Sequence, residues 1–214
     1  MKLSRGFTLI EIIVVMAIFL FVIGAALAIF ISIVQHQKRV LSEQQILNQI
    51  SYTEEYMSKA IRMAKVATTA SDGNCLSLGY TYLLIPSSNS PDLFEGIKFV
   101  NQSDLDSYGD PICQQFFLDT DGILKEEKNN DPNTITPLTS ADLQINFARF
   151  SIDGKDGSVA GQGCSDDPTQ CGARAVDGIQ PRVTILLNVK IAGDTQESSR
   201  TIQTTVSQRN LNVR

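Results

Sequence analysis

The feature that most constrains this chain is an uninterrupted apolar run from Ile12 to Ile31. These twenty residues include no charged or strongly polar side chain. A helix needs about 20 such residues, each adding about 1.5 Å, to cross about 30 Å of hydrocarbon. The run therefore predicts a membrane-spanning helix near the N-terminus.

No helix-breaking signal follows this run for several turns. Residues 7–67 contain no proline and a single glycine, Gly24. Farther along, apolar residues recur at steps of three, four or seven and form one stripe on a polar helix. The residues of this stripe are Val40, Leu47, Ile50, Met57, Ile61 and Ala64. We therefore expect a membrane helix over residues 7–34 that continues as an amphipathic stem over residues 35–70, with the stripe packed on the rest of the protein.

Residues 71–214 have the pattern of a β-rich head. Short runs with aromatic or branched residues, bounded by Pro, Gly, Asn and Asp, predict strands. They cover Tyr80–Ile85, Gly96–Val100, Ile112–Asp119 and Ile123–Glu126. The Asp121-Gly122 pair between the last two runs is typical of a hairpin turn. A further strand is predicted by the alternation of Leu143, Ile145 and Phe147 with Gln144, Asn146 and Ala148.

The C-terminal part of the head shows the cleanest strand pattern. Arg182–Ile191 is apolar at every second residue, and Thr201–Ser207 follows after a polar turn, which predicts a terminal hairpin. Before it, Asp153–Asp177 is rich in Gly, Ser and Asp and predicts a long loop. The predicted fold class is α+β: a long N-terminal helix packed against a mainly antiparallel sheet.

Charge is divided between the two parts of the chain. Residues 1–70 carry seven Lys or Arg and four Asp or Glu, whereas residues 71–214 carry eleven and nineteen. The head therefore has a net charge of −8, which is 11 minus 19. An acidic head repels phosphate backbones, so no nucleic-acid binding is expected for it.

The four cysteines, Cys75, Cys113, Cys164 and Cys171, all follow the apolar run. An even number on one side of a membrane fits disulfides in an oxidising compartment. Cys164 and Cys171 enclose only six residues, including an Asp-Asp-Pro turn sequence, so we expect them to pair and to leave Cys75 for Cys113. No CxxC motif occurs and the single histidine, His36, is distant in sequence, so no zinc site is expected.

The segment Lys2–Glu11 reads Lys-Leu-Ser-Arg-Gly-Phe-Thr-Leu-Ile-Glu and leads directly into the apolar run. It resembles the leader and cleavage signature of type IV prepilins and type II secretion pseudopilins, and the likeness is close over about the first thirty residues. The resemblance implies a pilin-like fold and a leader, residues 1–6, that prepilin peptidase removes by cutting after Gly6. It also implies methylation of the new N-terminal amine of Phe7, and pairing of Glu11 with the amine of a neighbouring subunit.

The residues themselves support a special role for Glu11. A carboxylate at the centre of a bilayer costs about 2.5–3.5 kcal/mol on insertion scales, and less toward the edge, and such groups are usually functional. The span offers no cation to Glu11, but cleavage after Gly6 would create one at Phe7. At hydrogen-bond distance in a low dielectric, an amine and a carboxylate attract strongly. Lys2 and Arg5 would hold the leader at the cytoplasmic face.

Simpler interpretations remain open. An uncleaved signal anchor explains the basic stub and the apolar run, but explains neither Glu11 nor the Gly-Phe step. A secretory signal cleaved after Ala28 would need an apolar core longer than the usual ~7–15 residues. Asp119–Gly122 and Asp153–Gly157 suggest calcium loops, but neither has the alternating ligands of such a loop, and both are better explained as turns. Calcium is kept as an alternative, and no other cofactor is expected.

These features together favour a minor pilin or a larger minor pseudopilin. The sequence has no nucleophile elbow, phosphate loop or HExxH motif, so an enzyme is not expected. The chain would cross the cytoplasmic membrane once, with an extracytoplasmic head, and then enter an extracytoplasmic filament. The partners that the resemblance implies are prepilin peptidase, other pilin or pseudopilin subunits and an inner-membrane assembly platform. The competing function is a signal-anchored binding protein or adhesin that does not assemble into a filament.

Overall fold

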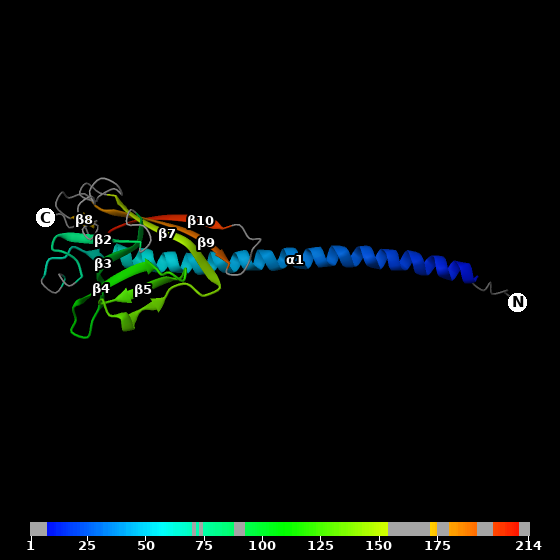
Figure 1. Cartoon of the computed structure of the whole chain (residues 1–214), viewed down its shortest axis with the longest axis horizontal. Helices are drawn as coiled ribbons and strands as arrows, with labels where there is room; N and C mark the ends of the chain where they lie inside the picture. Colours follow the sequence, from blue (N-terminus) through cyan, green and yellow to red (C-terminus); the bar gives the residue numbers. More distant parts are fainter. Residues whose placement is uncertain are drawn as a thin grey trace. The chain divides into compact units, whose positions relative to one another are not determined.

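The computed structural model of the chain describes residues 8–69, 72, 75–87, 93–153, 172–174, 180–191 and 199–209. The chain divides into two compact units, Met1–Gln45 and Ile46–Arg214. Helix α1 (Leu9–Arg62) contributes residues to both units, and the described strands belong to the second unit (Figure 1). The predicted α+β architecture of a long N-terminal helix and antiparallel strands is confirmed.

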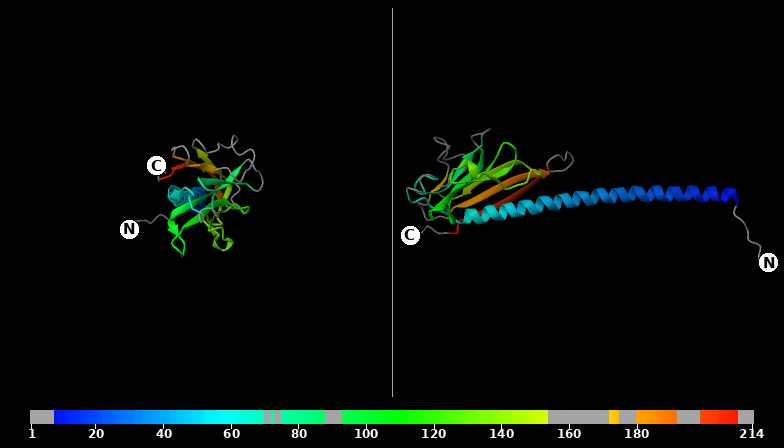
Figure 2. Two further views of the ribbon diagram at one scale, coloured as in Figure 1. Left: turned by 90° about the vertical axis from the view of Figure 1, so that its left-hand side faces the viewer. Right: turned by 90° about the horizontal axis from the view of Figure 1, so that it is seen from below.

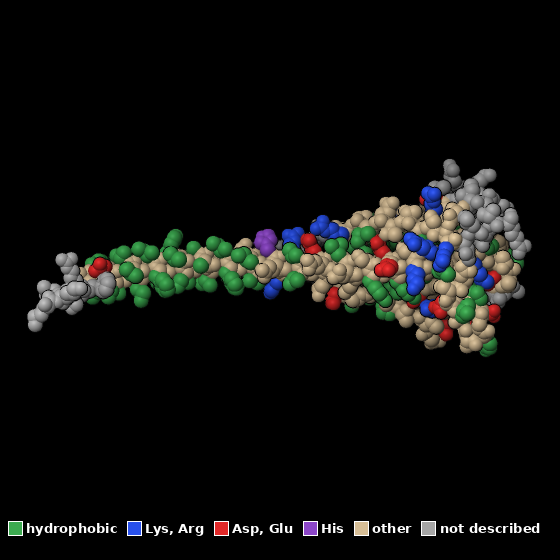
Figure 3. Space-filling model, turned by 180° about the vertical axis from the view of Figure 1, so that it is seen from behind, with side chains coloured by type: hydrophobic (Ala, Val, Ile, Leu, Met, Phe, Trp, Pro, Cys, Tyr) green, Lys and Arg blue, Asp and Glu red, His purple; other side chains and the backbone are tan. Residues whose placement is uncertain are grey.

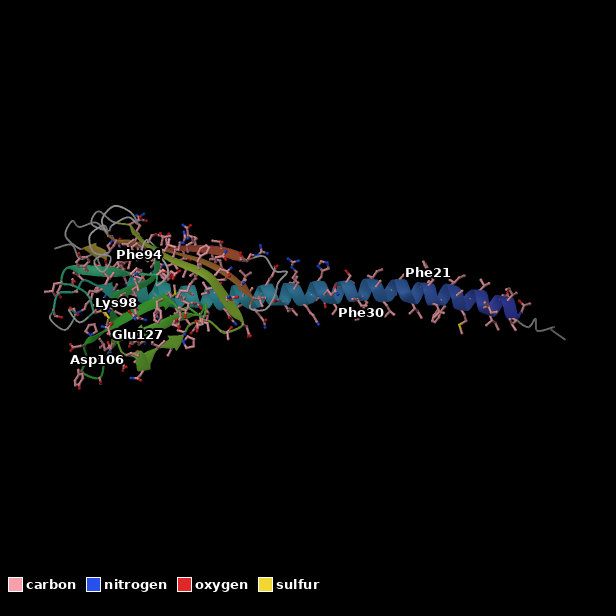
Figure 4. All side chains as sticks on the ribbon, in the orientation of Figure 1. Phe21, Phe30, Phe94, Lys98, Asp106 and Glu127 are labelled. Carbon is pink, nitrogen blue, oxygen red and sulfur yellow. A yellow bond between two sulfur atoms is a disulfide. The ribbon has the colours of Figure 1, made fainter. Side chains whose placement is uncertain are left out.

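In the first unit, the described residues from Leu9 to Gln45 are all helical. Every side chain from Leu9 to Ile33 is exposed. Phe21 is 79% exposed and Phe30 is 63% exposed, and both project away from the helix (Figure 4). Apolar side chains therefore face outward on all sides of this segment, as in a helix that lipid or other helices surround.

In the second unit, one face of α1 is buried. Its members follow steps of three or four, as the amphipathic pattern predicted. They are Ile46, Ile50, Thr53, Met57, Ala60 and Ile61. The prediction is wrong for Leu47 and for Val40 of the first unit, which are each 52% exposed. At about 100° per residue, Leu47 lies roughly 90° from the centre of the buried face, and Val40 lies farther still.

Helix α1 ends at Arg62, so the predicted continuation of the stem to residue 70 is wrong. The next residues, Ala64–Lys65, form strand β1 and pair antiparallel with β3 (Phe94–Leu105). The Gln102 amide of β3 donates to the Met63 carbonyl oxygen (3.1 Å). The helix ends there because backbone groups after Arg62 form hydrogen bonds with strand β3. Ala64 is buried as predicted, but in a strand.

The larger sheet of the second unit has seven strands, and each pair is antiparallel. Its order is β6-β5-β4-β3-β2-β8, and β1 also pairs with β3. The remaining strands are β2 (Tyr80–Pro86), β4 (Pro111–Leu118), β5 (Leu124–Lys128), β6 (Thr136–Pro137) and β8 (Gly172–Arg174), with a short 3-10 helix, η2 (Pro132–Thr134), before β6. Four of these strands, β2 to β5, confirm the four predicted in this region.

A second sheet has three strands in the order β10-β9-β7. These are β7 (Leu143–Asp153), β9 (Arg182–Ile191) and β10 (Arg200–Ser207). The hairpin of β9 and β10 confirms the predicted terminal hairpin. The sequence predicted one sheet, whereas the described residues form two. Both sheets and the buried face of α1 contribute to one hydrophobic core, and Figure 2 shows β9 and β10 alongside the last turns of α1.

Strand β7 contains a β-bulge that reverses its alternation. Asn146 is an additional residue on this strand, because Ile145 and Phe147 face consecutive residues of β9. Beyond the bulge, Ala148 is fully buried and Phe147 is partly exposed. The predicted common face of Leu143, Ile145 and Phe147 is therefore wrong at Phe147.

The predicted Asp-Gly hairpin is confirmed between β4 and β5. The Asp119 amide donates to the Ile123 carbonyl oxygen (3.0 Å), and the Gly122 amide donates to the Asp119 carbonyl oxygen (3.0 Å). Gly122 has a φ of 77°, which a residue without a side chain adopts at no steric cost.

The predicted loop over Asp153–Asp177 is wrong in one part. Residues 172–174 form β8, which pairs with β2 at the edge of the larger sheet. Residues 154–171 and 175–179 lie outside the described residues. Backbone pairing needs no particular side chain, which explains why a Gly-containing segment of low β-propensity can still supply a strand.

Aromatic rings join α1 to the larger sheet. Tyr56 of α1 contacts Phe116 edge-on, with ring centres 6.1 Å apart. Phe116 contacts Phe99 (5.7 Å), which contacts Tyr82 (6.2 Å). Phe116, Phe99 and Tyr82 have no exposed surface. Such aromatic pairs add about 0.5–1.5 kcal/mol beyond the burial of apolar area, so the rings anchor the helix on β3 and β4.

A buried polar network lies beside these rings. The Tyr56 hydroxyl donates to Glu126 Oε1 (2.8 Å), and the Gln114 side-chain amide donates to the same oxygen. The Asn101 amide donates in turn to Gln114 Oε1 (2.7 Å). Burial, together with the bond to Glu126 and its charge, raises the pKa of the Tyr56 phenol. Each polar group thus has a partner, as a buried network requires.

Candidate functional site

The start of α1 is built by two polar side chains, Thr8 and Glu11. The Thr8 amide and hydroxyl both donate to Glu11 Oε2, at 3.3 and 3.4 Å. The Glu11 amide is 3.4 Å from Thr8 Oγ1, which accepts its hydrogen bond. This reciprocal arrangement is a capping box, in which a Thr and a Glu three residues later satisfy free amides of the first helical turn.

The capping box gives Glu11 a defined position before any partner arrives. Its carboxylate lies in the first turn of α1, where the helix dipole favours negative charge. Both residues are exposed. A role was predicted for Glu11 but not for Thr8, although the T-x-x-E spacing of Thr8-Leu9-Ile10-Glu11 indicates a capping box.

The proposed cleavage site stands immediately before this box. Gly6 and Phe7 lie outside the described residues, so processing between them stays a prediction. Residues 1–27 match the family model described as "Prokaryotic N-terminal methylation motif". Comparisons with curated proteins and with solved structures found no match.

The matched motif supports the assignment of this N-terminal segment to the type IV pilin and pseudopilin family. The segment is therefore similar to the N-terminal segment of prepilins, the class of protein that prepilin peptidase processes. Helix α1, which begins within this segment, is long and apolar enough to cross a membrane. An N-terminal helix of this kind fits a membrane-anchored pilin.

The predicted disulfide between Cys75 and Cys113 is confirmed, with Cα atoms 5.3 Å apart. Cys113 lies on β4, and Cys75 follows the segment after α1. The two half-cystines pack with Ala67, Leu76 and Val100 in a small apolar cluster of their own. Cys164 and Cys171 lie outside the described residues, so their pairing stays a prediction.

The segment before Cys75 is held by one buried carboxylate, Asp72, which is 4% exposed. The Lys65 ammonium lies 2.9 Å from Asp72 Oδ1, and the amides of Thr68 and Thr69 each donate to Oδ2 at 3.0 Å. Burial alone would raise the pKa of Asp72, but the hydrogen bonds from Lys65, Thr69 and Thr68 outweigh it and lower this pKa to about 2.

The first of the two suggested calcium loops is occupied by a lysine. The Lys125 ammonium contacts Asp119 and lies 2.9 Å from Asp121 Oδ2. Its hydrogen bond to Asp119 lowers the pKa of that carboxyl group. Among the described residues, no three His, Cys, Asp or Glu side chains are close enough to hold a metal ion. The second loop, after Asp153, lies outside the described residues.

Proposed function

We propose that this protein is a structural, non-enzymatic subunit of a type IV pilus or of a type II secretion-like filament. Prepilin peptidase would remove residues 1–6, and the chain would then leave the cytoplasmic membrane for the filament with its head outside the cytoplasm. The observation that carries the proposal is the methylation motif over residues 1–27 together with the exposed apolar helical segment Leu9–Ile33, which begins within the motif and extends beyond it.

The exposure of the apolar helix supports assembly as well as anchoring. From Leu9 to Ile33 no side chain is buried within the chain. A monomer can cover this surface only with lipid, whereas a filament can cover it with the helices of neighbouring subunits. The hydrophobic effect contributes about 25 cal/mol per Å² of apolar surface removed from water, so a subunit outside the membrane must find such neighbours. An inner-membrane platform would supply the step that extracts it.

Glu11 would set the register between neighbouring helices. In the single chain its carboxylate accepts two long hydrogen bonds from Thr8. The Phe7 amine of a neighbour would carry a full positive charge, so it would add an attraction between opposite charges that the neutral donor groups of Thr8 lack. The capping box therefore holds the carboxylate in place without a cation of its own, and leaves it able to accept one.

We further propose a minor rather than a major subunit. The head, residues 71–214, is large for a major pseudopilin and ends in the antiparallel β9–β10 hairpin, which resembles the larger minor class. Glu11 is present, which argues against the tip subunit that usually lacks this glutamate.

Processing is tested by intact-mass analysis of the protein extracted from membranes. The expected product lacks six residues and begins at a methylated Phe7. Inactivating the peptidase should leave the full-length chain and shift the mass by the leader. A mature protein that begins at Met1 with active peptidase would instead support the anchored binding protein or adhesin, and one that begins at Ile29 would indicate an ordinary secretory signal.

The assembly role of Glu11 is tested with two substitutions. Glu11→Ala should insert into the membrane at least as well as the natural chain, because a costly carboxylate is removed, but should be lost from sheared filaments. Glu11→Gln keeps an oxygen that can accept from Thr8 and removes only the charge. If the charge sets the register, Glu11→Gln should fail to assemble as well.

Glu43→Ala provides the control, because it also removes one carboxylate from α1 but beyond the apolar run, where Glu43 is partly exposed and pairs with Arg39. It should assemble normally. Filament content is measured by immunoblotting sheared filaments against the membrane fraction. Incorporation of Glu11→Gln at the natural level would contradict the charge-pairing role.

A further inference from the structure

A groove of about 880 Å³ lies in the Ile46–Arg214 unit, between the last turns of α1 and the end of β10. Three cationic side chains line it: Lys59 and Arg62 from α1, and Arg209, which follows β10. Hydroxyl groups of Ser103, Thr205 and Ser207 line it too. Figure 3 shows Lys and Arg side chains grouped on this part of the head.

The walls of the groove are fixed by hydrogen bonds. The Arg209 amide donates to the Arg62 carbonyl oxygen (2.8 Å), which places the two guanidinium-bearing residues side by side. Gln208, only 2% exposed, donates from its side chain to the Ala64 carbonyl oxygen (2.9 Å). The hydroxyl of Ser103, which also lines the groove, donates to Asn101 Oδ1 (2.7 Å). The groove is therefore formed before any ligand arrives.

The cations of the groove differ from other cations of this unit. Lys65, Lys125 and Lys128 each pair with an aspartate at 2.7–2.9 Å. Among the described residues, no Asp or Glu lies within ion-pair distance of Lys59, Arg62 or Arg209. This includes Glu55, the one carboxylate that lines the groove. The groove thus concentrates positive charge beside residues 71–214, whose net charge is −8.

The dipole of α1 accounts for two of the three cations in the groove, but not for the third. Lys59 and Arg62 stand in the last turn, where positive charge interacts favourably with the helix dipole. Arg209 comes from the opposite end of the chain. The Arg62 carbonyl oxygen is already satisfied by the backbone amide of Arg209, so the guanidinium of Arg209 is not needed for that purpose. Its positive charge remains available to a ligand.

Strand β10 indicates the kind of ligand. It pairs with β9 on one edge, and no described strand pairs with its other edge. Thr201, Gln203, Thr205 and Ser207 on this strand are exposed and polar. An unpaired edge offers amides and carbonyl groups to an extended peptide, with neighbouring side chains supplying specificity. A lipid headgroup or a free phosphate would use the cations but not this edge.

We propose that this groove binds an extended acidic segment of a partner protein, alongside β10. Closely spaced carboxylates of the segment would meet Lys59, Arg62 and Arg209, while its backbone would pair with the free edge of β10. Nucleic acids and anionic membranes carry dense negative charge that the acidic head repels, whereas a short segment brings only a few charges into the groove. The proposal goes beyond the filament role, because a single chain suffices for binding.

The test uses the full chain in a mild, uncharged detergent and fluorescein-labelled octapeptides. The probe is (Glu-Thr)4, and its binding is measured by fluorescence anisotropy at low and at physiological salt. The uncharged (Ser-Thr)4 should not bind. (Glu-Pro)4 keeps all four carboxylates but lacks half of the backbone amides, so it should bind at least several-fold more weakly if the segment pairs with the strand edge.

The triple variant Lys59→Gln, Arg62→Gln, Arg209→Gln should bind (Glu-Thr)4 at least about tenfold more weakly. All three side chains are exposed, so the head should stay folded. The control variant Arg149→Gln, Lys190→Gln, Lys128→Gln removes the same charge outside the groove and should bind normally. The exchange Lys59→Arg, Arg62→Lys, Arg209→Lys should also retain binding.

Three results would overturn the proposal: equal loss in the two triple-glutamine variants, binding of (Glu-Pro)4 as tight as that of (Glu-Thr)4, or tighter binding of a single-stranded oligodeoxynucleotide or of vesicles with anionic lipid. The assay needs no filament. A chain that binds the peptide but never assembles would therefore contradict the proposed function and leave this inference standing.

Discussion

Phe21 and Phe116 carry the same side chain in opposite environments. Phe21, in the first unit, is 79% exposed, whereas Phe116, in the second, has no exposed surface. The difference extends to the whole of each unit. Apolar side chains of the first unit lack partners within the described chain, and those of the second form a common core with two sheets. Only the second unit carries the contacts that would let it fold without a membrane or a neighbour.

This contrast indicates that the second unit determines the stability of the protein and that the first unit determines its location and assembly. The head has an internal core, a confirmed disulfide and buried polar networks. The N-terminal helix has local backbone bonds and a capping box, and everything else must come from its surroundings. Changes in the first unit should therefore alter location and assembly, and changes in the second should alter the free energy of unfolding.

The largest expected effect comes from deleting residues 1–34. Fully transferring one large apolar side chain from water is worth about 1.5–3 kcal/mol, and the deletion removes most of the exposed apolar side chains of the first unit. The shortened chain should move entirely from the membrane fraction to the soluble fraction. Its thermal unfolding midpoint should match that of the head in the full chain in detergent. An unfolded soluble fragment would show that the head depends on the first unit.

The second prediction compares the two phenylalanines directly. Phe116→Ala should lower the free energy of unfolding by about 3–5 kcal/mol, because it opens a cavity between α1 and the larger sheet. Phe21→Ala should change it by less than about 0.5 kcal/mol. Denaturant unfolding of the full chain in detergent, followed by tyrosine fluorescence, measures both. A comparable loss in the two variants would remove the distinction between the units.

The third prediction concerns the disulfide of the head. Replacing Cys75 and Cys113 together by Ala should lower the free energy of unfolding by about 2–4 kcal/mol, because the bridge spans 38 residues and restricts the unfolded chain. The full-length variant should still reach the membrane. Non-reducing peptide mapping of the natural protein tests the remaining prediction: Cys164 should be linked to Cys171, and a link from Cys75 to either of them would contradict both assignments.

The smallest expected effect concerns pH and Asp72. The pKa of Asp72 is lowered to about 2 in the folded chain, below about 3.9 in an unfolded one. Its contribution to stability is therefore fully present above about pH 4 and is lost as the pH falls toward 2. Asp72→Asn should lower the free energy of unfolding by about 1–2 kcal/mol at neutral pH, with a smaller difference near pH 2. The exposed Asp142→Asn serves as the control, and an equal effect there would contradict this role.

The helical, apolar character of residues 9–33 could be predicted from sequence, because its determinants are local. An apolar run of twenty residues and a T-x-x-E box act within a few residues of one another. The same holds for the Asp121-Gly122 turn and for the alternation of β9, where Val183, Ile185 and Leu187 are fully buried. The pairing of Cys75 with Cys113 followed from the enclosure of a short loop by the other two cysteines.

The structure of the head depended on contacts between residues distant in sequence, which no local sequence pattern could predict. The bulge at Asn146 turned Phe147 outward and Ala148 inward, and β8 formed where composition indicated a loop. Helix α1 ended at Arg62 because the following residues pair with β3. Each of these outcomes was decided by a partner strand distant in sequence.

The sequence by itself thus determined the N-terminal methylation motif, the apolar helix and the most regular strands, because side-chain chemistry at short spacing specifies them. Only the tertiary structure decided how the strands divide into two sheets and which residues meet at the end of α1. Arg209 lies in the groove with Lys59 and Arg62 because its backbone amide donates a hydrogen bond to the Arg62 carbonyl oxygen. Such a juxtaposition depends on the path of the whole chain, and it left no periodic signal in the sequence.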